Sequence, residues 1–161
     1  MAKKTKVKKT LVEQILTKSG VSHKGIQINA LEGELPSEYE RNHIFKTLAL
    51  LGEKTGPVIG IVPITEHLSE KKLAKISGNK KVSMIPQKDL EKTTGYVHGA
   101  NNPVGIHQKH NYPIYIDETA LELEKMIVSA GEVGHSIIIS PKDLANFVKA
   151  SFVDILEESN S

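Results

Sequence analysis

A single lysine interrupts the most apolar segment of the chain, residues 44–51. Successive side chains of a β-strand point to opposite faces, so Lys46 is expected to share a face with apolar neighbours, namely Ile44, Leu48 and Leu50. An ammonium group among inward-facing apolar side chains is costly unless it meets a partner or reaches a cleft. Two interpretations follow: Lys46 is a functional cation at a cleft, or it is an edge-strand lysine whose stem carries its charge to water.

A second candidate feature is a segment rich in glycine, asparagine and proline at residues 95–112, with Gly99 and Ala100 near its middle. Glycine lets the backbone approach a ligand closely, and backbone amides can hold a phosphate or a developing oxyanion. The sequence predicts a loop over this whole segment. The alternative to a binding loop is an ordinary turn-rich surface loop.

A third feature is a glycine-bracketed turn at residues 131–134, with Ser129 before it and His135 and Ser136 after it. Two serines and a histidine suggest nucleophilic catalysis. The Gly-x-Ser-x-Gly elbow and a recognisable triad order are missing from the sequence, however. Ser129 is more simply interpreted as a polar lining residue at a strand end.

The chain has no cysteine and seven histidines. It therefore has no thiolate zinc ligand and no cysteine nucleophile. His107 and His110 are three residues apart with His98 nearby, but zinc needs three or four convergent ligands, and Gly105 and Pro113 argue against a helix around the pair. We expect no metal and no cofactor.

The net charge of +2 is unevenly placed, since the first nine residues hold five lysines. The other residues carry 16 basic and 19 acidic side chains, a net charge of −3, so the body is not a strongly basic nucleic-acid binder. The lysine-rich arm could contact a phosphate backbone, or it is a solvated tail. A local group of lysines offers a second docking surface, or a solvated helix face: Lys71, Lys72, Lys75, Lys80 and Lys81.

Short strands and short helices are mixed along the chain, with no strict strand–helix–strand alternation and no phosphate-binding glycine turn. Helices are predicted from residue 11 to Gly20, at 37–42, at 69–78 with Leu73 and Ile76 on the inner face, at 86–92, at 119–125 and from the Ser140-Pro141 start. Strands are predicted near 25–30 and at 43–51, 57–63, 82–85, 113–116, 126–129, 136–139 and 152–156. This pattern indicates an α+β domain.

The chain has the size of one domain, which we place at residues 9–157, between a basic flexible arm at 1–8 and a polar tail at 158–161. No apolar run approaches the ~20 residues of a membrane helix, and the basic N-terminus has no apolar signal segment. We therefore expect a cytoplasmic protein without membrane attachment.

Several short motifs in consistent order between about residues 8 and 156 resemble the YbaK/EbsC family of bacterial Cys-tRNA(Pro) deacylases, which is related to the editing domain of prolyl-tRNA synthetases. The motifs are Phe45–Leu48, Leu73-Ala74, Lys80–Val82, Thr94–Tyr96 with Gly99, Pro103 and Gly105, Thr119–Glu122, Val128–Gly131 and Ile139–Leu144. Three features depart from the family pattern. The usual Gly-Gly pair is Gly99-Ala100, Asn102 replaces a serine before the loop proline, and residues 26–29 have no aromatic side chain where many members carry one.

The resemblance implies a barrel-like mixed sheet surrounded by short helices, and cleavage of the ester between cysteine and the 3′ end of transfer RNA. It implies an essential lysine, which maps onto Lys46, and a glycine loop at the substrate, which maps onto Gly99. Around them we expect Thr47, Ala100, Ser129 and Ser136 to contact the substrate. The resemblance also suggests that the substrate's own thiol attacks the ester, and it makes prolyl-tRNA synthetase a candidate partner.

Three other functions remain open at this stage. The nearest is a water-dependent deacylase for alanine or another small amino acid on transfer RNA. The second is a non-catalytic module that binds transfer RNA or a synthetase. The third is a small hydrolase acting on a metabolite ester.

Overall fold

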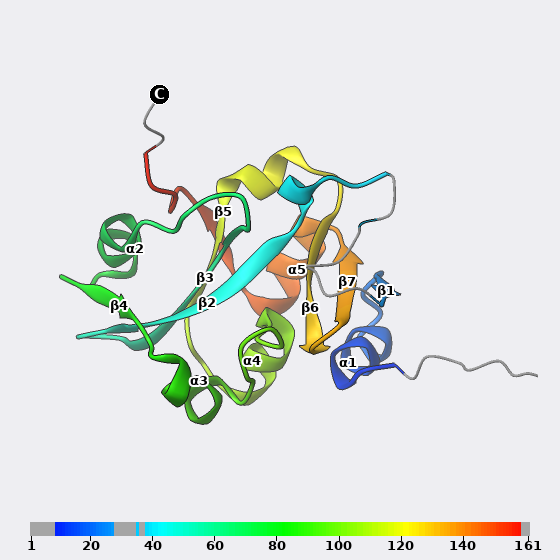
Figure 1. Ribbon diagram of the computed structural model, residues 1–161, viewed down its shortest axis with the longest axis horizontal. Helices are drawn as coiled ribbons and strands as arrows, with labels where there is room; N and C mark the ends of the chain where they lie inside the picture. Colours follow the sequence, from blue (N-terminus) through cyan, green and yellow to red (C-terminus); the bar gives the residue numbers. More distant parts are fainter. Residues whose placement is uncertain (1–8, 28–34, 36–37, 159–161) are drawn as a thin grey trace, which may run out of the picture.

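Two β-sheets form the body of the protein, with five α-helices around them in the part of the chain that the computed structural model describes, residues 9–27, 35 and 38–158 (Figure 1). The strands are β1 (Lys24–Ile26), β2 (Phe45–Gly52), β3 (Gly56–Pro63), β4 (Val82–Met84), β5 (Ile114–Asp117), β6 (Met126–Glu132), β7 (His135–Ile139) and β8 (Ser151–Val153). The helices are α1 (Leu11–Lys18), α2 (Glu70–Ser77), α3 (Gln87–Thr94), α4 (Pro103–Lys109) and α5 (Pro141–Val148), with 3₁₀ turns η1 (Arg41–His43) and η2 (Glu118–Glu122).

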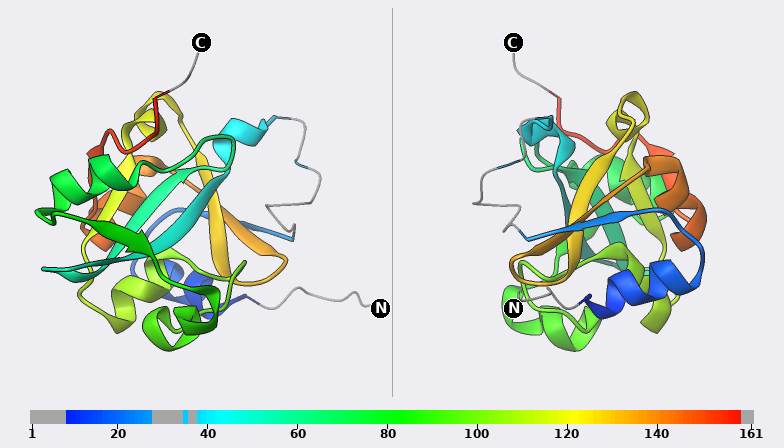
Figure 2. Two further views of the ribbon diagram at one scale, coloured as in Figure 1. Left: turned by 60° about the vertical axis from the view of Figure 1, so that its left-hand side comes forward. Right: turned by 90° about the vertical axis from the view of Figure 1, so that its right-hand side faces the viewer.

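The larger sheet has the strand order β4-β2-β3-β5-β8, and the smaller has β1-β7-β6. The β2–β3 and β2–β4 pairs are antiparallel, whereas β3–β5 and β5–β8 are parallel. A parallel bridge between Ile44 and Ile127 connects the start of β2 to β6, so the two sheets meet at one side (Figure 2). The α+β class is confirmed, but the described residues form two sheets and no closed barrel, so the expected barrel-like form is not confirmed.

Apolar side chains fill the space between the sheets. The main core joins the inner faces of β2, β3, β5, β6 and β7 to α1, α4 and α5. A second core lies under α2, where Leu73 packs with Leu50, Val58 and Ile155. The prediction that Ile76 also faces inward is wrong, because its side chain is 38% exposed and Ala74 takes the buried position beside Leu73.

Most predicted elements are confirmed, including the β2–β3 hairpin and the α5 start, where Ser140 Oγ accepts a hydrogen bond from the Asp143 N–H. The loop predicted over 95–112 is wrong in its second half, which forms α4. The Asn102 side chain caps this helix and Pro103 takes its first position, a start signal that the glycine- and asparagine-rich composition concealed. The predicted segments near 25–30 and 37–42 lie partly outside the described residues.

No helix in the described ranges is long and apolar enough to cross a membrane. Within the same ranges, no three His, Asp or Glu side chains gather closely enough to hold a metal ion. The argument against a helix around His107 was nevertheless wrong, because His107 lies in α4.

His107 of α4 packs against α5. The centre of its ring lies 5.9 Å from the centre of the Phe147 ring, in an edge-on arrangement. Burial lowers the pKa of His107 below its usual value, and the positive charge of Lys149 lowers it further. The folded state therefore favours the neutral imidazole.

This lowered pKa predicts a loss of stability in mild acid. The unfolded chain protonates His107 near pH 6.5, whereas the folded chain resists protonation, so the stabilisation is complete above that pH and is lost as pH falls through the folded pKa. His107→Gln should lose less free energy of unfolding between pH 7 and pH 5 than the wild type in urea titrations. The exposed neighbour Gln108 gives the control, since Gln108→Ala leaves His107 in place and should keep the wild-type pH dependence. Equal slopes for His107→Gln and the wild type would contradict the prediction.

Candidate functional site

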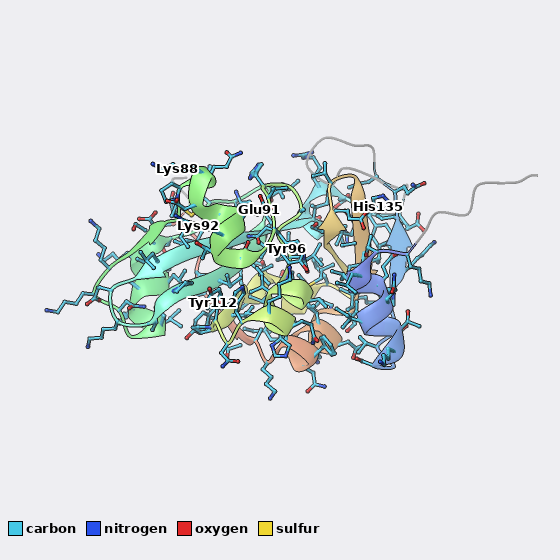
Figure 3. The ribbon with its side chains drawn as sticks, turned by 90° about the horizontal axis from the view of Figure 1, so that it is seen from below. Lys88, Glu91, Lys92, Tyr96, Tyr112 and His135 are labelled. Carbon is cyan, nitrogen blue, oxygen red and sulfur yellow. The ribbon has the colours of Figure 1, made fainter. Side chains whose placement is uncertain are left out.

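A cavity of about 420 Å³ opens beside the first half of β2. Its walls come from β2, from Met84 at the end of β4 and Ile85 after it, from α3, from the loop around Gly99 and from the β6–β7 hairpin. In Figure 3, seen from below, α3 with Lys88 lies on one side and His135 of the hairpin on the other, with Tyr96 between them. The cavity volume is within the range of 300–1,000 Å³ that is usual for small-molecule sites.

The cavity exists because β2 is paired on its outer edge only near its end. Residues Leu50–Gly52 pair with β4, but no strand among the described residues pairs with Phe45–Ala49 on that side. Two other contacts meet this open edge: the Asn101 side chain donates from Nδ2 to the Thr47 carbonyl at 3.0 Å, and the Ile85 N–H donates to the Ala49 carbonyl at 3.1 Å. Side chains from both faces of β2 can thus reach one cavity.

Lys46 lines this cavity and is half-buried. On β2 it lies opposite Val62 of β3. No carboxylate of the described residues forms an ion pair with Lys46. Of the two interpretations drawn from the sequence, the structure places the lysine at a cleft and leaves its charge available to a ligand.

The Gly99 loop is held in place from both sides. Gly99 has φ of +89°, a conformation that favours glycine, and its carbonyl accepts a hydrogen bond from Ser129 Oγ at 3.4 Å. The buried Asn102 fixes the other end, because its Oδ1 accepts from the Gly105 N–H and its Nδ2 donates to the Ala100 carbonyl. The loop is therefore an ordered wall of the cavity.

Five of the six predicted site residues line the cavity together: Lys46, Thr47, Gly99, Ser129 and Ser136. Ser129 and Ser136 are directly opposite each other on β6 and β7. Ala100 is not among the lining residues, because its side chain is buried behind the loop. Its expected contact with the substrate would have to come from the backbone.

Ser129 is not arranged as an activated nucleophile. Its hydroxyl donates to the Gly99 carbonyl and accepts from the Gly131 N–H at 3.1 Å, so backbone groups rather than a histidine engage it. Nucleophilic catalysis needs a base within hydrogen-bond reach of the attacking hydroxyl. The structure therefore favours the interpretation of Ser129 as a lining and loop-positioning residue.

Four polar residues of the cavity wall were not among the predicted site residues: Gln87, His98, Asn101 and His135. Asn101 is the most informative of them. It is only 7% exposed, and its Oδ1 has no hydrogen-bond partner in the described part of the chain. The same is true of the Oγ1 of Thr47, which is 9% exposed. No spacing or motif marks Asn101 in the sequence, since the open edge of β2 that it binds appears only in the folded chain.

The lysine group near α2 is partly neutralised. Lys72 forms ion pairs with Glu158 at 2.7 Å and Asp154 at 3.0 Å. The hydrogen bonds that its ammonium group donates to Glu158 and Asp154 raise the pKa of Lys72 above its usual value. Lys72 is therefore a poor choice for a phosphate contact, and the lysine arm at 1–8 lies outside the described residues.

Comparison with known proteins assigns the class. A family model described as the aminoacyl-tRNA editing domain matches residues 35–147, a range that includes every lining residue of the cavity. The chain belongs to the aminoacyl-tRNA editing domain family.

A protein of Enterococcus faecalis named "Putative Cys-tRNA(Pro)/Cys-tRNA(Cys) deacylase EbsC" is 39% identical over 162 residues, covering 96% of this chain and 98% of that protein. Two solved structures share the fold. One, of "a putative trans-editing enzyme for prolyl tRNA synthetase", has a TM-score of 0.78 at 24% identity over 91% of this chain and 95% of its own. The other, of "hypothetical protein APE2540", has a TM-score of 0.78 at 20% identity over 91% and 99%.

Gly105 provides a stability test of the wall of this site. It lies inside α4, where alanine is normally better than glycine by about 1 kcal/mol. A Cβ at this position would overlap the hydroxyl and ring of Tyr96, whose side chain also lies under the Lys109 ammonium. We expect Gly105→Ala to lower the free energy of unfolding by about 1–3 kcal/mol in urea titrations.

The matched control removes the Tyr96 side chain that the added Cβ would overlap. In a Tyr96→Ala background the same Gly105→Ala substitution should become neutral or stabilising, because only helix propensity remains. A Gly105→Ala protein that is more stable than the wild type would contradict the packing described here.

Proposed function

We propose that this protein is a trans-editing deacylase that removes cysteine from mischarged Cys-tRNA(Pro), with Cys-tRNA(Cys) as a second candidate substrate. The observation that carries the proposal is the cavity itself, in which one unpaired cation, Lys46, meets neutral polar groups and apolar walls. The name of the 39% identical relative supports the choice of cysteine and of these transfer RNAs.

An aminoacyl ester is already activated, so the protein has to position it and stabilise developing charge more than it has to supply a strong nucleophile. Lys46 would place its ammonium group against the 3′-terminal phosphate or the ester oxygens. Backbone amides near Gly99 would hold the carbonyl oxygen as it gains negative charge. Thr47, Ser129 and Ser136, which line the same cavity, would contact the amino group or the ribose.

The attacking group in this proposal is the substrate's own thiol. Its sulfur forms a bond to the ester carbonyl carbon, the bond from that carbon to the ribose oxygen breaks, and the thiol proton ends on the ribose oxygen. The products are a cyclic thioester and transfer RNA with a free 3′ end, and water opens the thioester afterwards. The hydrogen bonds of Ser129 to backbone groups support this route, because they leave that hydroxyl without a base.

Prolyl-tRNA synthetase is the expected partner in this scheme, since mischarged tRNA(Pro) arises on that enzyme. A role in translation would place the protein in the cytoplasm. The main alternative is a deacylase that uses a positioned water and removes alanine or another small amino acid. Editing is needed in either case, because a binding pocket discriminates poorly between amino acids of similar size.

The first test removes the charge of Lys46 while keeping its apolar stem. Lys46→Met should lower kcat/KM for cysteine release from Cys-tRNA(Pro) by about 100-fold or more, as expected for the loss of a group that stabilises developing charge. The measurement is release of labelled cysteine under single-turnover conditions. Lys88→Met, on the exposed side of α3 next to the cavity wall, should stay within about twofold of the wild type.

Binding separates an enzyme from a passive module. Filter binding should show that Lys46→Met still holds Cys-tRNA(Pro) while releasing no cysteine. A wild-type protein that binds Cys-tRNA(Pro) but never cleaves it would instead establish the binding-module alternative.

The second test uses a panel of esters on the same transfer RNA. If the thiol attacks, seryl and alanyl esters should react at least about 100-fold more slowly than the cysteinyl ester, because they lose the intramolecular attack. Rate constants for Cys-, Ser- and Ala-tRNA(Pro) measured side by side provide the comparison. Similar rates for all three would reject thiol attack and favour the water-dependent alternative.

A further inference from the structure

Two buried polar atoms at the cavity have no hydrogen-bond partner among the residues that the structure describes. They are Thr47 Oγ1 and Asn101 Oδ1, and both side chains are more than nine-tenths buried and line the cavity. Buried polar atoms in folded proteins are nearly always paired, so two unpaired atoms at one cavity need an explanation. A bound ligand that supplies the missing partners is the simplest one.

The missing partner of Asn101 Oδ1 must be a hydrogen-bond donor. The amide of Asn101 is fixed in orientation, because its Nδ2 donates to the Thr47 carbonyl at the open edge of β2. The atom left over is the amide oxygen, which can only accept. The Thr47 hydroxyl can also accept, so both atoms suit one donor group that carries several hydrogens.

The charges around the cavity narrow the choice of donor. None of the described residues that line it is Asp or Glu, so no carboxylate is available there to hold a substrate ammonium group. Lys46 and Thr47 are adjacent on β2, and their side chains leave the strand on opposite faces. A substrate cation beside Thr47 and Asn101 would therefore be kept apart from the ammonium of Lys46.

We infer that Asn101 Oδ1, together with Thr47 Oγ1, accepts hydrogen bonds from the α-ammonium group of the aminoacyl ester, which makes Asn101 a specificity-determining residue. This inference rests on the function proposed above. The α-ammonium group carries three N–H donors, whereas an N-blocked ester such as peptidyl-tRNA offers one neutral N–H at most. The site would thus recognise free aminoacyl esters and spare chains that are being elongated.

The test compares two esters that differ only in the amino group: cysteinyl-tRNA(Pro) and 3-mercaptopropionyl-tRNA(Pro). Both carry the thiol, so both can undergo the proposed attack. The wild type should prefer the cysteinyl ester in kcat/KM by about tenfold or more, the usual size of a hydrogen bond to a charged group. Asn101→Ala should lose most of that preference, with a large loss on the cysteinyl ester and a change within about twofold on the other.

A second variant separates recognition from support of the loop. Thr47→Val removes Oγ1 but keeps the Thr47 carbonyl that anchors Asn101, so it should also reduce the preference between the two esters. Asn111→Ala, at an exposed position after α4, is the matched control and should leave both rates unchanged.

The outcomes that reject the inference differ from those that reject the proposed function. Equal losses on the two esters in Asn101→Ala would mean that Asn101 only supports the loop, and a wild type that treats the two esters alike would mean that the amino group is not recognised. Either result overturns the inference and leaves the deacylase standing. A wild-type protein that releases neither cysteine nor 3-mercaptopropionic acid from these esters would overturn both the proposed function and the inference.

Discussion

The open edge of β2 is the constraint on which the rest of the site depends. A strand edge with unpaired backbone groups invites association with other strands, and folded proteins cover such edges. Here β4 covers only the last three residues, while the Asn101 side chain and the Ile85 N–H meet the edge further along. The loop that carries Asn101 must then stay in one conformation, which the left-handed Gly99, the Ser129 hydroxyl and the Asn102 cap provide. The cavity is the space between these contacts.

The charges of the residues that line the cavity suit the oxygen atoms of an ester better than they suit a positively charged ligand. Lys46 is half-buried without an ion pair, and the described lining residues include no carboxylate to neutralise it. In a site partly shielded from water, such a charge attracts phosphate and ester oxygens more strongly than it would on the surface. The same absence of acids leaves a substrate amino group dependent on neutral acceptors. The same arrangement of charges therefore affects both the ester oxygens and the amino group of the substrate.

Much of this arrangement could be predicted from the sequence because it depends on interactions between residues that are close in the chain. The β2–β3 hairpin and the α5 cap follow from strand patterning, turn residues and capping residues, which act over a few positions. The odd polarity of Lys46 within an apolar strand was visible for the same reason. What could not be predicted depends on contacts between distant segments. Asn101 matters because it reaches Thr47, 54 residues earlier, and α4 was hidden by a composition typical of loops.

The two departures from the family pattern that lie in the loop, Ala100 and Asn102, are explained by where the fold places them. Ala100 and Asn102 have almost no exposed surface and do not line the cavity, so they act on the loop's packing rather than on the substrate. Asn102 caps α4, a role that asparagine and serine both fill well. The residue between them, Asn101, does reach the cavity. In this chain the proposed recognition of the amino group would therefore depend on Asn101, while Ala100 and Asn102 keep that residue in place.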